Sequence, residues 1–359
     1  MKALALSLGR NLGSFARSQV AGPFAILGIL VLVASLTTPR FLVIQNLRNL
    51  GLEMAIIAII AIGSTLVILT AQIDLSPGSI VALTSMTTAL LLTDANMSPP
   101  VVFVLMLLLG AGAGLVNGFF CSYGRIPSFI FTLATLSIFR GLAFYENGGT
   151  PIFDLQGLEH VFYDELGGVP YPFLYVVLLY AVAWAYLRYT RGGRRIYAVG
   201  GNASAAHLVG IKVNRVRMKV FVIAGVLSAF GGLLMSAQLN SGSPDYGTGF
   251  ELQAIAAAVI GGASLFGGQG SIIATLFGAT IITVVQNVLN LHSVGTAWQN
   301  ITTGVIIALA VGFDMWRNEV ARLAVRGWHD LSSLRRAPQP QVTAEAATPA
   351  EEPERASTS

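Results

Sequence analysis

Apolar stretches of roughly 20 residues, with little or no charge, recur along the chain, and this is about the length that a helix needs to cross a bilayer. Short polar segments separate them and hold most of the charged residues. The pattern predicts an all-α, polytopic membrane protein with about ten transmembrane helices. The predicted spans are residues 21–38, 51–70, 78–93, 99–120, 127–145, 171–188, 219–239, 252–266, 271–290 and 296–313.

Two polar, glycine-rich segments interrupt this pattern, Thr70–Leu83 ("TAQIDLSPGSIVAL") and Gly261–Thr275 ("GGASLFGGQGSIIAT"). Aligned at an offset of 192 residues, they match at five positions, which hints at an internal repeat. Irregular backbone at membrane depth is tolerated only inside protein or beside a water-filled cavity, and paired broken helices are typical of transport sites. The candidates for a translocation pathway or gate are Asp74, Ser76, Gly78, Ser79, Asn117, Gly261 and Gly262.

A simpler interpretation of both segments stays open. Each could be a tight turn between neighbouring spans, with the Asp74 side chain capping the helix that begins near Ser76. An ionisable group near a span is nevertheless a functional hypothesis by default, so Asp74 is kept among the candidates.

The segment Gly110–Gly118 ("GAGAGLVNG") spaces Gly110, Gly114 and Gly118 four residues apart. This spacing lets two helix backbones approach closely, so we expect a packing seam here, with Asn117 able to bond across it. Arg140 is expected near the outer end of a span, where its long side chain can reach the polar surface.

The segment Tyr197–Ile211 ("YAVGGNASAAHLVGI") is small, polar and flanked by arginine and lysine. Asn202 is a good N-cap, "ASAAHLV" is a short helical run, and Gly210 suits the C′ position. A helix this short is marginal in water by itself. It therefore either packs on the protein's own inner surface or docks on a cytoplasmic partner.

Charge sets the predicted orientation. The stretch from Arg188 to Lys219 holds eight basic residues and no acid, whereas the stretch from Glu146 to Pro170 holds five acids and no lysine or arginine. Lysine and arginine favour cytoplasmic loops, so ten spans place both termini in the cytoplasm. Arg40 and Arg48 fall on the outer side in this arrangement and are its weak point.

The predicted organisation has three parts. Residues 1–20 form a cytoplasmic tail, residues 21–316 the transmembrane domain with a cytoplasmic loop at 189–218, and residues 317–359 a second cytoplasmic tail. That tail is expected to be disordered from about residue 337, because it is rich in proline and glutamate and has too few apolar residues to form a core.

Composition excludes several classes of protein. Charged residues make up 11% of the chain against about 25% in soluble domains. A single cysteine, Cys121, excludes an intramolecular disulfide, and no metal-ligand spacing is present, so we expect no metal and no cofactor. The motifs of phosphate loops, zinc proteases and serine hydrolases are also missing, which predicts a protein that is not an enzyme and has no ATPase site.

Four segments in order resemble the ribose/xylose/galactose-type permeases, the inner-membrane components of bacterial ABC sugar importers. The resemblance runs from about residue 47 to residue 314. The segments are "IDLSPGS", "NGFFCSYGRIPSFIFTLATLSIFRGLAF", "YAVGGNASAAHLVGIKVNRVRMKVFVIAG" and "GTGFELQAIAAAVIGGASLFGGQGSIIAT". In the family, the usual form of the first segment has valine in place of Pro77.

The resemblance implies a permease in the bacterial inner membrane that moves a monosaccharide. It implies three kinds of partner: a cytoplasmic ATP-binding subunit, a periplasmic sugar-binding protein, and a second permease copy or sister permease. The loop 189–218 would couple to the ATPase, through a helix whose candidate residues are Gly200, Gly201, Asn202, Ala205, Ala206 and Gly210. The alternatives are an ion-coupled secondary transporter, with Asp74 as its carrier, and a branched-chain amino acid ABC permease.

Overall fold

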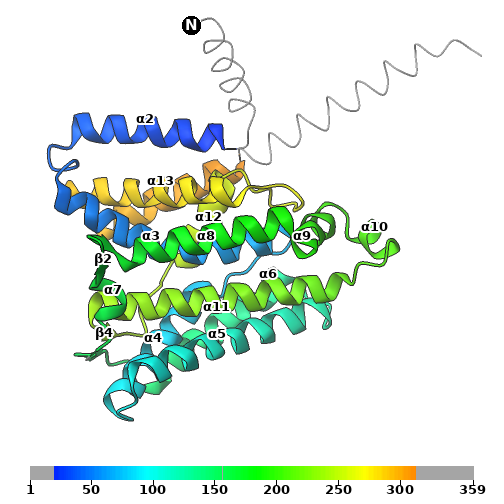
Figure 1. Cartoon of the computed structure of the whole chain (residues 1–359), viewed down its shortest axis with the longest axis horizontal. Coiled ribbons are helices and arrows are strands. Elements are labelled where there is room, and N and C mark those ends of the chain that lie inside the picture. The colour runs from blue at the N-terminus through cyan, green and yellow to red at the C-terminus, as the bar shows by residue number, and fades with distance from the viewer. Residues whose placement is uncertain (1–19, 156, 313–359) are drawn as a thin grey trace, which may run out of the picture. The chain divides into compact units, whose positions relative to one another are not determined.

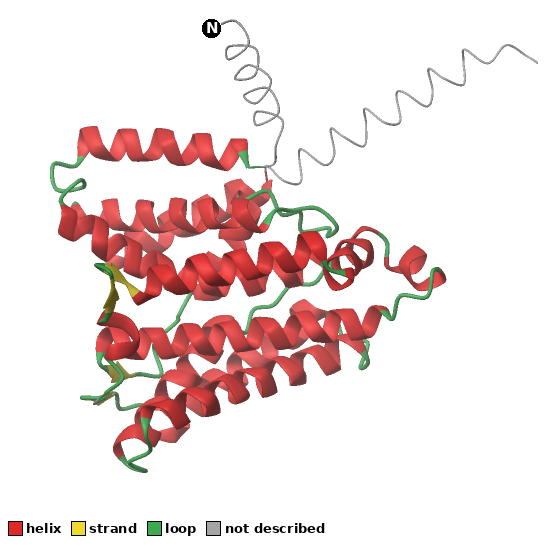
Figure 2. Ribbon diagram, in the orientation of Figure 1, coloured by secondary structure: helices red, strands yellow, loops and turns green. Residues whose placement is uncertain are grey.

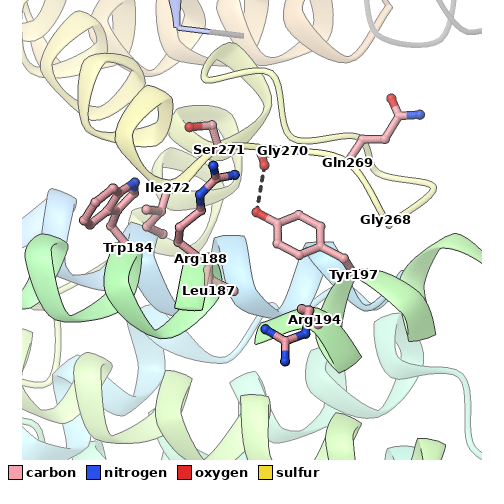
Figure 3. Close-up of a pocket in the computed structure, with 10 residues that line it drawn as sticks. All are labelled: Trp184, Leu187, Arg188, Arg194, Tyr197, Gly268, Gln269, Gly270, Ser271 and Ile272. Atoms are coloured by element: carbon pink, nitrogen blue, oxygen red, sulfur yellow. Dashed lines mark hydrogen bonds between the residues drawn. The ribbon is translucent and has the colours of Figure 1, made fainter. Parts of the chain in front are cut away.

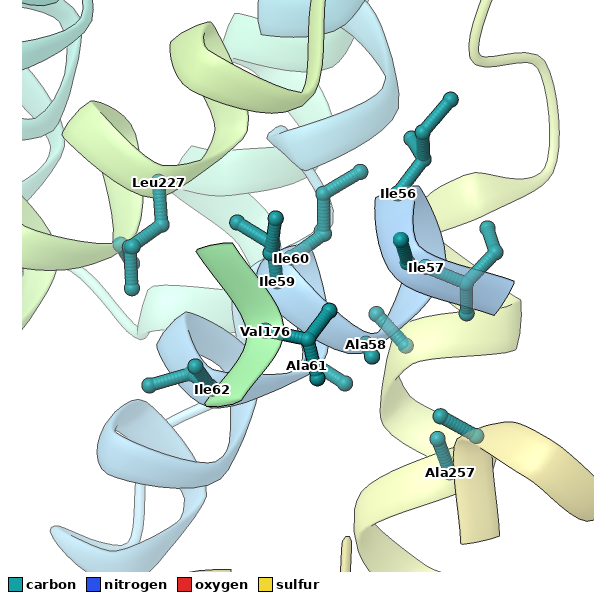
Figure 4. Packing of buried hydrophobic residues seen from close by; sticks show 14 of the residues in the cluster. Ile56, Ile57, Ala58, Ile59, Ile60, Ala61, Ile62, Val176, Leu227 and Ala257 are labelled. Carbon is teal, nitrogen blue, oxygen red and sulfur yellow. The ribbon is translucent and has the colours of Figure 1, made fainter. Parts of the chain in front are cut away.

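Helix α3 (Ile44–Leu69) lies at the centre of the fold in the computed structural model, which describes residues 20–155 and 157–312 (Figure 1). Between Ala55 and Ile62 every side chain is isoleucine or alanine, and all are buried. A helix that is apolar on all sides has no face for solvent, so it takes the core position. Figure 4 shows these side chains packed against α8, α11 and α12.

The other helices surround α3 in two groups. On one side, α11 (Val213–Leu239) packs on α3, α4 (Pro77–Thr93) and α5 (Pro99–Ser122), and α6 (Ser128–Glu146) packs on α4. On the other side lie α12 (Phe250–Ile260), α13 (Ile272–Leu291) and, outside α13, α2 (Ala21–Thr37). Helix α8 (Tyr171–Tyr189) also contacts α3, and a last helix covers residues 296–312.

Many outward-facing side chains of these helices are large and apolar. Leu36, Leu108, Val177, Leu178 and Leu309 each expose more than 60% of their surface. Six of the described helices, α3, α5, α6, α8, α11 and α13, are long and apolar enough to cross a membrane. The chain is therefore a multi-pass membrane protein, with a helix at each of the ten predicted positions within the described residues. The number of membrane crossings and the orientation of the termini stay predictions.

One end of the helix group carries short strands. β1 (Ile152–Phe153) pairs antiparallel with β4 (Ser241–Gly242), and β2 (Glu165–Leu166) pairs with β3 (Val169–Pro170). Helix α7 (His160–Tyr163) lies between β1 and β2 in the chain, and α10 (Ala203–Leu208) lies at the opposite end of the helix group (Figure 1). Arg48, at the start of α3, forms an ion pair with Glu165 of the acidic segment. These two residues are therefore on the same side of the protein.

The seam predicted from the glycine spacing is present between α5 and α11. A β-carbon at Gly114 would lie 2.8 Å from Cα of Val222, and one at Gly118 would lie 2.9 Å from Cα of Met218. Gly225 of α11 faces the seam in return, because a β-carbon there would lie 2.9 Å from Cα of Gly114. The packing interpretation is confirmed, but Asn117 bonds to Ser76 of the first break and not across this seam.

Two short helices join α8 to α11, where the sequence predicted only one (Figure 2). Helix α9 (Arg191–Gly201) was not expected, because four of its eleven residues are glycine. Helix α10 (Ala203–Leu208) has the predicted position and caps. The predicted tails at 1–20 and 317–359 lie outside the described residues, except for Val20.

Candidate functional site

The first helix break is an extended segment between α3 and α4 whose backbone groups are bonded by side chains of α6. The amide of Ile73 donates to the Ser128 hydroxyl at 3.0 Å, and the amide of Leu75 donates to the Thr132 hydroxyl at 3.1 Å. The Thr132 hydroxyl also lies 3.3 Å from the carbonyl of Ile73. Since a bilayer offers no water to such groups, these hydroxyls let an extended segment exist among the helices.

The polar candidates of this break form one buried network. The Asp74 carboxylate accepts from the Ser76 amide at 2.9 Å and from the Ser76 hydroxyl at 2.7 Å. Asn117 of α5 donates to the Ser76 hydroxyl at 2.8 Å, and the Ser79 hydroxyl donates to the Ser76 carbonyl. All four side chains are buried. Asp74 therefore bonds to Ser76, the residue directly before α4, but within the described residues its side chain accepts from no amide of the first turn of α4, so the predicted capping of that helix is not seen.

Pro77 is the first residue of α4, where a missing amide proton leaves no helical bond unmade. Next to it, Gly78 is pressed against the loop before α12 and the first turn of α12: its β-carbon would overlap the carbonyl oxygen of Gly247 and the Glu251 carboxylate. Arg140 of α6 is half-buried and donates to the carbonyls of Tyr246, at 2.7 Å, and Gly78, at 3.2 Å. The Arg140 side chain thus bonds inside the protein, where the sequence predicted that it would reach the polar surface.

The second break contacts the first. Gly261 ends α12 against the first turn of α13, since a β-carbon there would lie 2.6 Å from the Thr275 amide nitrogen. Gly262 has φ +84°, a backbone conformation that favours glycine. Further on, the amide of Gly268 donates to the carbonyl of Leu69 at 3.0 Å. An apolar cluster joins the two breaks: Ile68, Leu75, Ile255, Ala258, Val259 and Ala263.

Helix α9 packs on both breaks. A β-carbon at Gly200 would lie 2.5 Å from the amide nitrogen of Gly268 and closer still to the carbonyl oxygen of Leu69. The Tyr197 hydroxyl donates to the carbonyl of Gly270 at 3.0 Å, beside a cavity of about 530 Å³ that Trp184 and Arg188 also line (Figure 3). Burial raises the pKa of Tyr197, which keeps this hydroxyl a donor. We call the two breaks with α9 the break junction: residues 69–78, 191–201 and 261–271.

Helix α10 extends away from the break junction. The Asn202 side chain accepts from the Ala205 amide at 2.9 Å, and Gly210 has φ +81°, so both predicted caps are confirmed. Ala206 is buried, whereas Gly201, Ala205 and Gly210 are exposed. Beyond them, Leu208 and Val209 expose 86% and 76% of their surface.

Comparison with known proteins identifies the family. Residues 46–311 match the family described as the permease component of branched-chain amino acid transport systems. The ribose import permease protein RbsC of Bacillus subtilis is 41% identical over 82% of this chain and 92% of its own length. The chain belongs to this permease family.

Two further relatives of the permease are also named as sugar transport proteins. The L-arabinose ABC transporter permease protein AraH of Azospirillum brasilense is 36% identical over 82% of this chain and 87% of its own. The D-allose transport system permease protein AlsC of Escherichia coli K12 is 34% identical over 82% and 90%. No solved structure gives a significant match to the permease.

The predicted site residues of the permease thus fall into three groups. Asp74, Ser76, Ser79 and Asn117 come together in a packed network, and Gly78, Gly261 and Gly262 serve close approach or a turn. Of the coupling candidates, Gly200 and Gly201 end α9 and belong to the break junction, and the other four belong to α10 and its ends. Within the described residues, no group of three His, Cys, Asp or Glu side chains could hold a metal ion.

Sequence reasoning missed the contact of α9 with both breaks and a separate set of polar side chains in α3, α12 and α13. A sequence signal for these polar side chains was present, since Glu53, Gln253 and Gln286 are isolated polar residues within apolar stretches.

Proposed function

We propose that this permease is the membrane-spanning subunit of an ABC importer that carries a monosaccharide, a pentose or a hexose, across the bacterial inner membrane. The observation that carries the proposal is the similarity, at 34–41% identity over more than four-fifths of the chain, to proteins named for ribose, D-allose and L-arabinose transport. These relatives are more specific than the family description, which names branched-chain amino acids.

In the proposed arrangement the protein has ten spans with both termini in the cytoplasm, and the loop 189–218 faces the cytoplasm. The Arg48–Glu165 ion pair supports this orientation. Arg48 counted against it when sequence alone was considered, but its charge is paired with an acid of the segment assigned to the outside.

The proposed partners are a cytoplasmic ATP-binding subunit, a periplasmic sugar-binding protein, and a second permease copy or sister permease. We propose that the ATP-binding subunit docks on α10 and its exposed residues Leu208 and Val209. An exposed apolar tip on a short helix is typical of a surface that a partner covers.

The path from α10 into the membrane is short. Helix α9 precedes α10 directly and contacts the end of α3 at Leu69 and the second break at Gly268. A displacement of α10 would therefore be transmitted through α9 to both breaks at once. Coupling between distant sites runs through such rigid, packed elements. The predicted gate residues would then move as parts of this packed unit, with Gly261 and Gly262 at the turn.

The alternative of an ion-coupled transporter would need an ionisable group free to exchange its ion. The Asp74 carboxylate is instead bonded to the amide and the hydroxyl of Ser76. We therefore keep the ABC importer as the proposed function.

The test is co-purification with the candidate ATP-binding subunit after extraction in mild detergent. Leu208→Glu should remove the partner, because a buried and unpaired charge at an interface costs several kcal/mol. The matched control is Leu166→Glu, at the opposite end of the protein, which is similarly exposed and should keep the partner. A complex that survives Leu208→Glu unchanged would argue against docking on α10, and the absence of any complex with the wild-type chain would argue against the ABC importer.

A further inference from the structure

A cavity of about 270 Å³ lies at the end of the helix group away from α10, between the early part of α3, the start of α12, the end of α11 and the second half of α13. Its polar lining includes Glu53, Gln238, Gln253 and Gln286, and the ring of Phe250 forms part of the wall. We call this the polar cavity. Cavities of this size suit a small ligand, below the range of drug-sized molecules.

Four side chains that line the polar cavity have no hydrogen-bond partner in the part of the chain that the structure describes, whereas its Thr283 and Asn290 are bonded. Within the described residues, Glu53, Gln238, Gln253 and Gln286 make no side-chain hydrogen bond. The side-chain oxygen of Gln253, Oε1, also has almost no surface exposed to solvent. A carboxylate and three carboxamides left unbonded are unfavourable beside lipid, so they must face water or a ligand that bonds to them.

The chemistry of the polar cavity suits a neutral polyhydroxyl compound. Its carboxylate accepts hydrogen bonds from hydroxyls, its carboxamides both donate and accept, and Phe250 offers an apolar surface for the C–H face of a ring. We propose that the polar cavity is a transient binding site for the monosaccharide inside the permease. This inference rests on the proposed function and adds where the sugar binds.

The lining also indicates what the polar cavity does not favour. It contains no lysine, arginine or histidine, so a phosphorylated sugar or the carboxylate of an amino acid would find no cationic partner. The single acid, Glu53, would repel such anions. The polar cavity therefore disfavours anionic groups and suits a neutral sugar.

The deciding experiment uses site-directed cysteine labelling in the complete importer. Cys121, the only native cysteine, is buried and is replaced by serine; Gln286→Cys then places one thiol in the polar cavity. A membrane-impermeant maleimide is added to the outside of spheroplasts, with and without ribose, D-allose or L-arabinose at high concentration. The sugar that the wild-type importer takes up should slow labelling at least ~3-fold, the change expected from occupancy of two-thirds or more of the sites.

The matched control is Gln45→Cys, an exposed glutamine at the start of α3 outside the polar cavity. This thiol should react at the same rate with and without sugar. If Gln286→Cys reacts at an unchanged rate in the presence of the transported sugar, or does not react at all, the inference is overturned while the proposed function stands. If the wild-type importer takes up no pentose and no hexose, the proposed function fails and the inference fails with it.

Uptake gives a second and independent measurement. Gln253→Leu should lower the uptake rate by roughly 3- to 10-fold, the range expected for one lost hydrogen bond. Co-purification with the ATP-binding subunit should be unchanged, which shows that the variant folds and assembles. Wild-type uptake by a fully assembled Gln253→Leu complex would contradict the role of the polar cavity.

Discussion

The break junction and the polar cavity both place polar groups among apolar helices, but they treat these groups in opposite ways. At the break junction, the extended backbone and the Asp74 carboxylate are bonded to neighbouring side chains and amides. In the polar cavity, Glu53 and Gln286 have no bonded partner in the described residues. Polar groups that are hydrogen-bonded within the protein stabilise its fold, whereas polar groups without partners are free to form hydrogen bonds with a solute. The difference separates residues that hold the permease together from residues that can bind what it carries.

The largest effect should come from adding one methyl group to the break junction. Gly200→Ala places a β-carbon against the backbone of Leu69 and Gly268, which cannot move aside as a side chain can. We expect a destabilisation of about 3 kcal/mol or more, the upper end of the range for overpacking, together with impaired uptake. A thermal-shift measurement in detergent would show this as a lower Tm.

The neighbouring glycine provides the control for that change. A β-carbon at Gly201 would meet nothing within 4 Å, so Gly201→Ala should leave the Tm almost unchanged. Equal Tm values for the two variants would contradict the close contact between α9 and the breaks.

A smaller effect is expected when one α6 hydroxyl that bonds to the break junction is removed. Thr132→Val deletes the acceptor of the Leu75 amide, which is then left buried without a partner. The expected destabilisation is about 1–3 kcal/mol. Thr280→Val is the matched control, because the Thr280 hydroxyl bonds only to a carbonyl of its own helix. The Tm should fall clearly more for Thr132→Val than for Thr280→Val.

The smallest effect on stability should come from the polar cavity itself. Gln286→Leu removes a carboxamide that bonds to nothing in the described residues, so the Tm should stay unchanged or rise slightly. Gln299→Leu removes a carboxamide that donates to Asn290, at 2.7 Å, and to the carbonyl of Val294, at 2.8 Å. It should destabilise the protein by roughly 1 kcal/mol. A larger loss for Gln286→Leu than for Gln299→Leu would remove the distinction between the two regions.

Features encoded by neighbouring residues could be predicted from the sequence. The apolar periodicity located the helices, the spacing of Gly110, Gly114 and Gly118 predicted the seam with α11, and Asn202 and Gly210 predicted both ends of α10. In each case the physical cause lies within a few residues of the signal.

Features that depend on distant contacts could not be predicted. Helix α9 is rich in glycine and has low intrinsic helix propensity, but Thr190 caps its start and its packing on the breaks supports its end. The Asp74 network needs Asn117, 41 residues away from Ser76, and the polar cavity collects residues from four helices. The sequence identified Asp74 and Asn117 as polar residues among apolar ones, but it could not tell which polar residues would be bonded.

The hydroxyls of Ser128 and Thr132 also have a consequence for how the protein is made. The amides of Ile73 and Leu75 leave the ribosome 55 and 57 residues before the side chains that accept from them. Until α6 enters the bilayer, the extended segment has no acceptors there for these two amides, and lipid provides none. The turn between α3 and α4 can therefore settle into the membrane only after α6 has been synthesised, so this part of the permease is completed in an order set by a serine and a threonine.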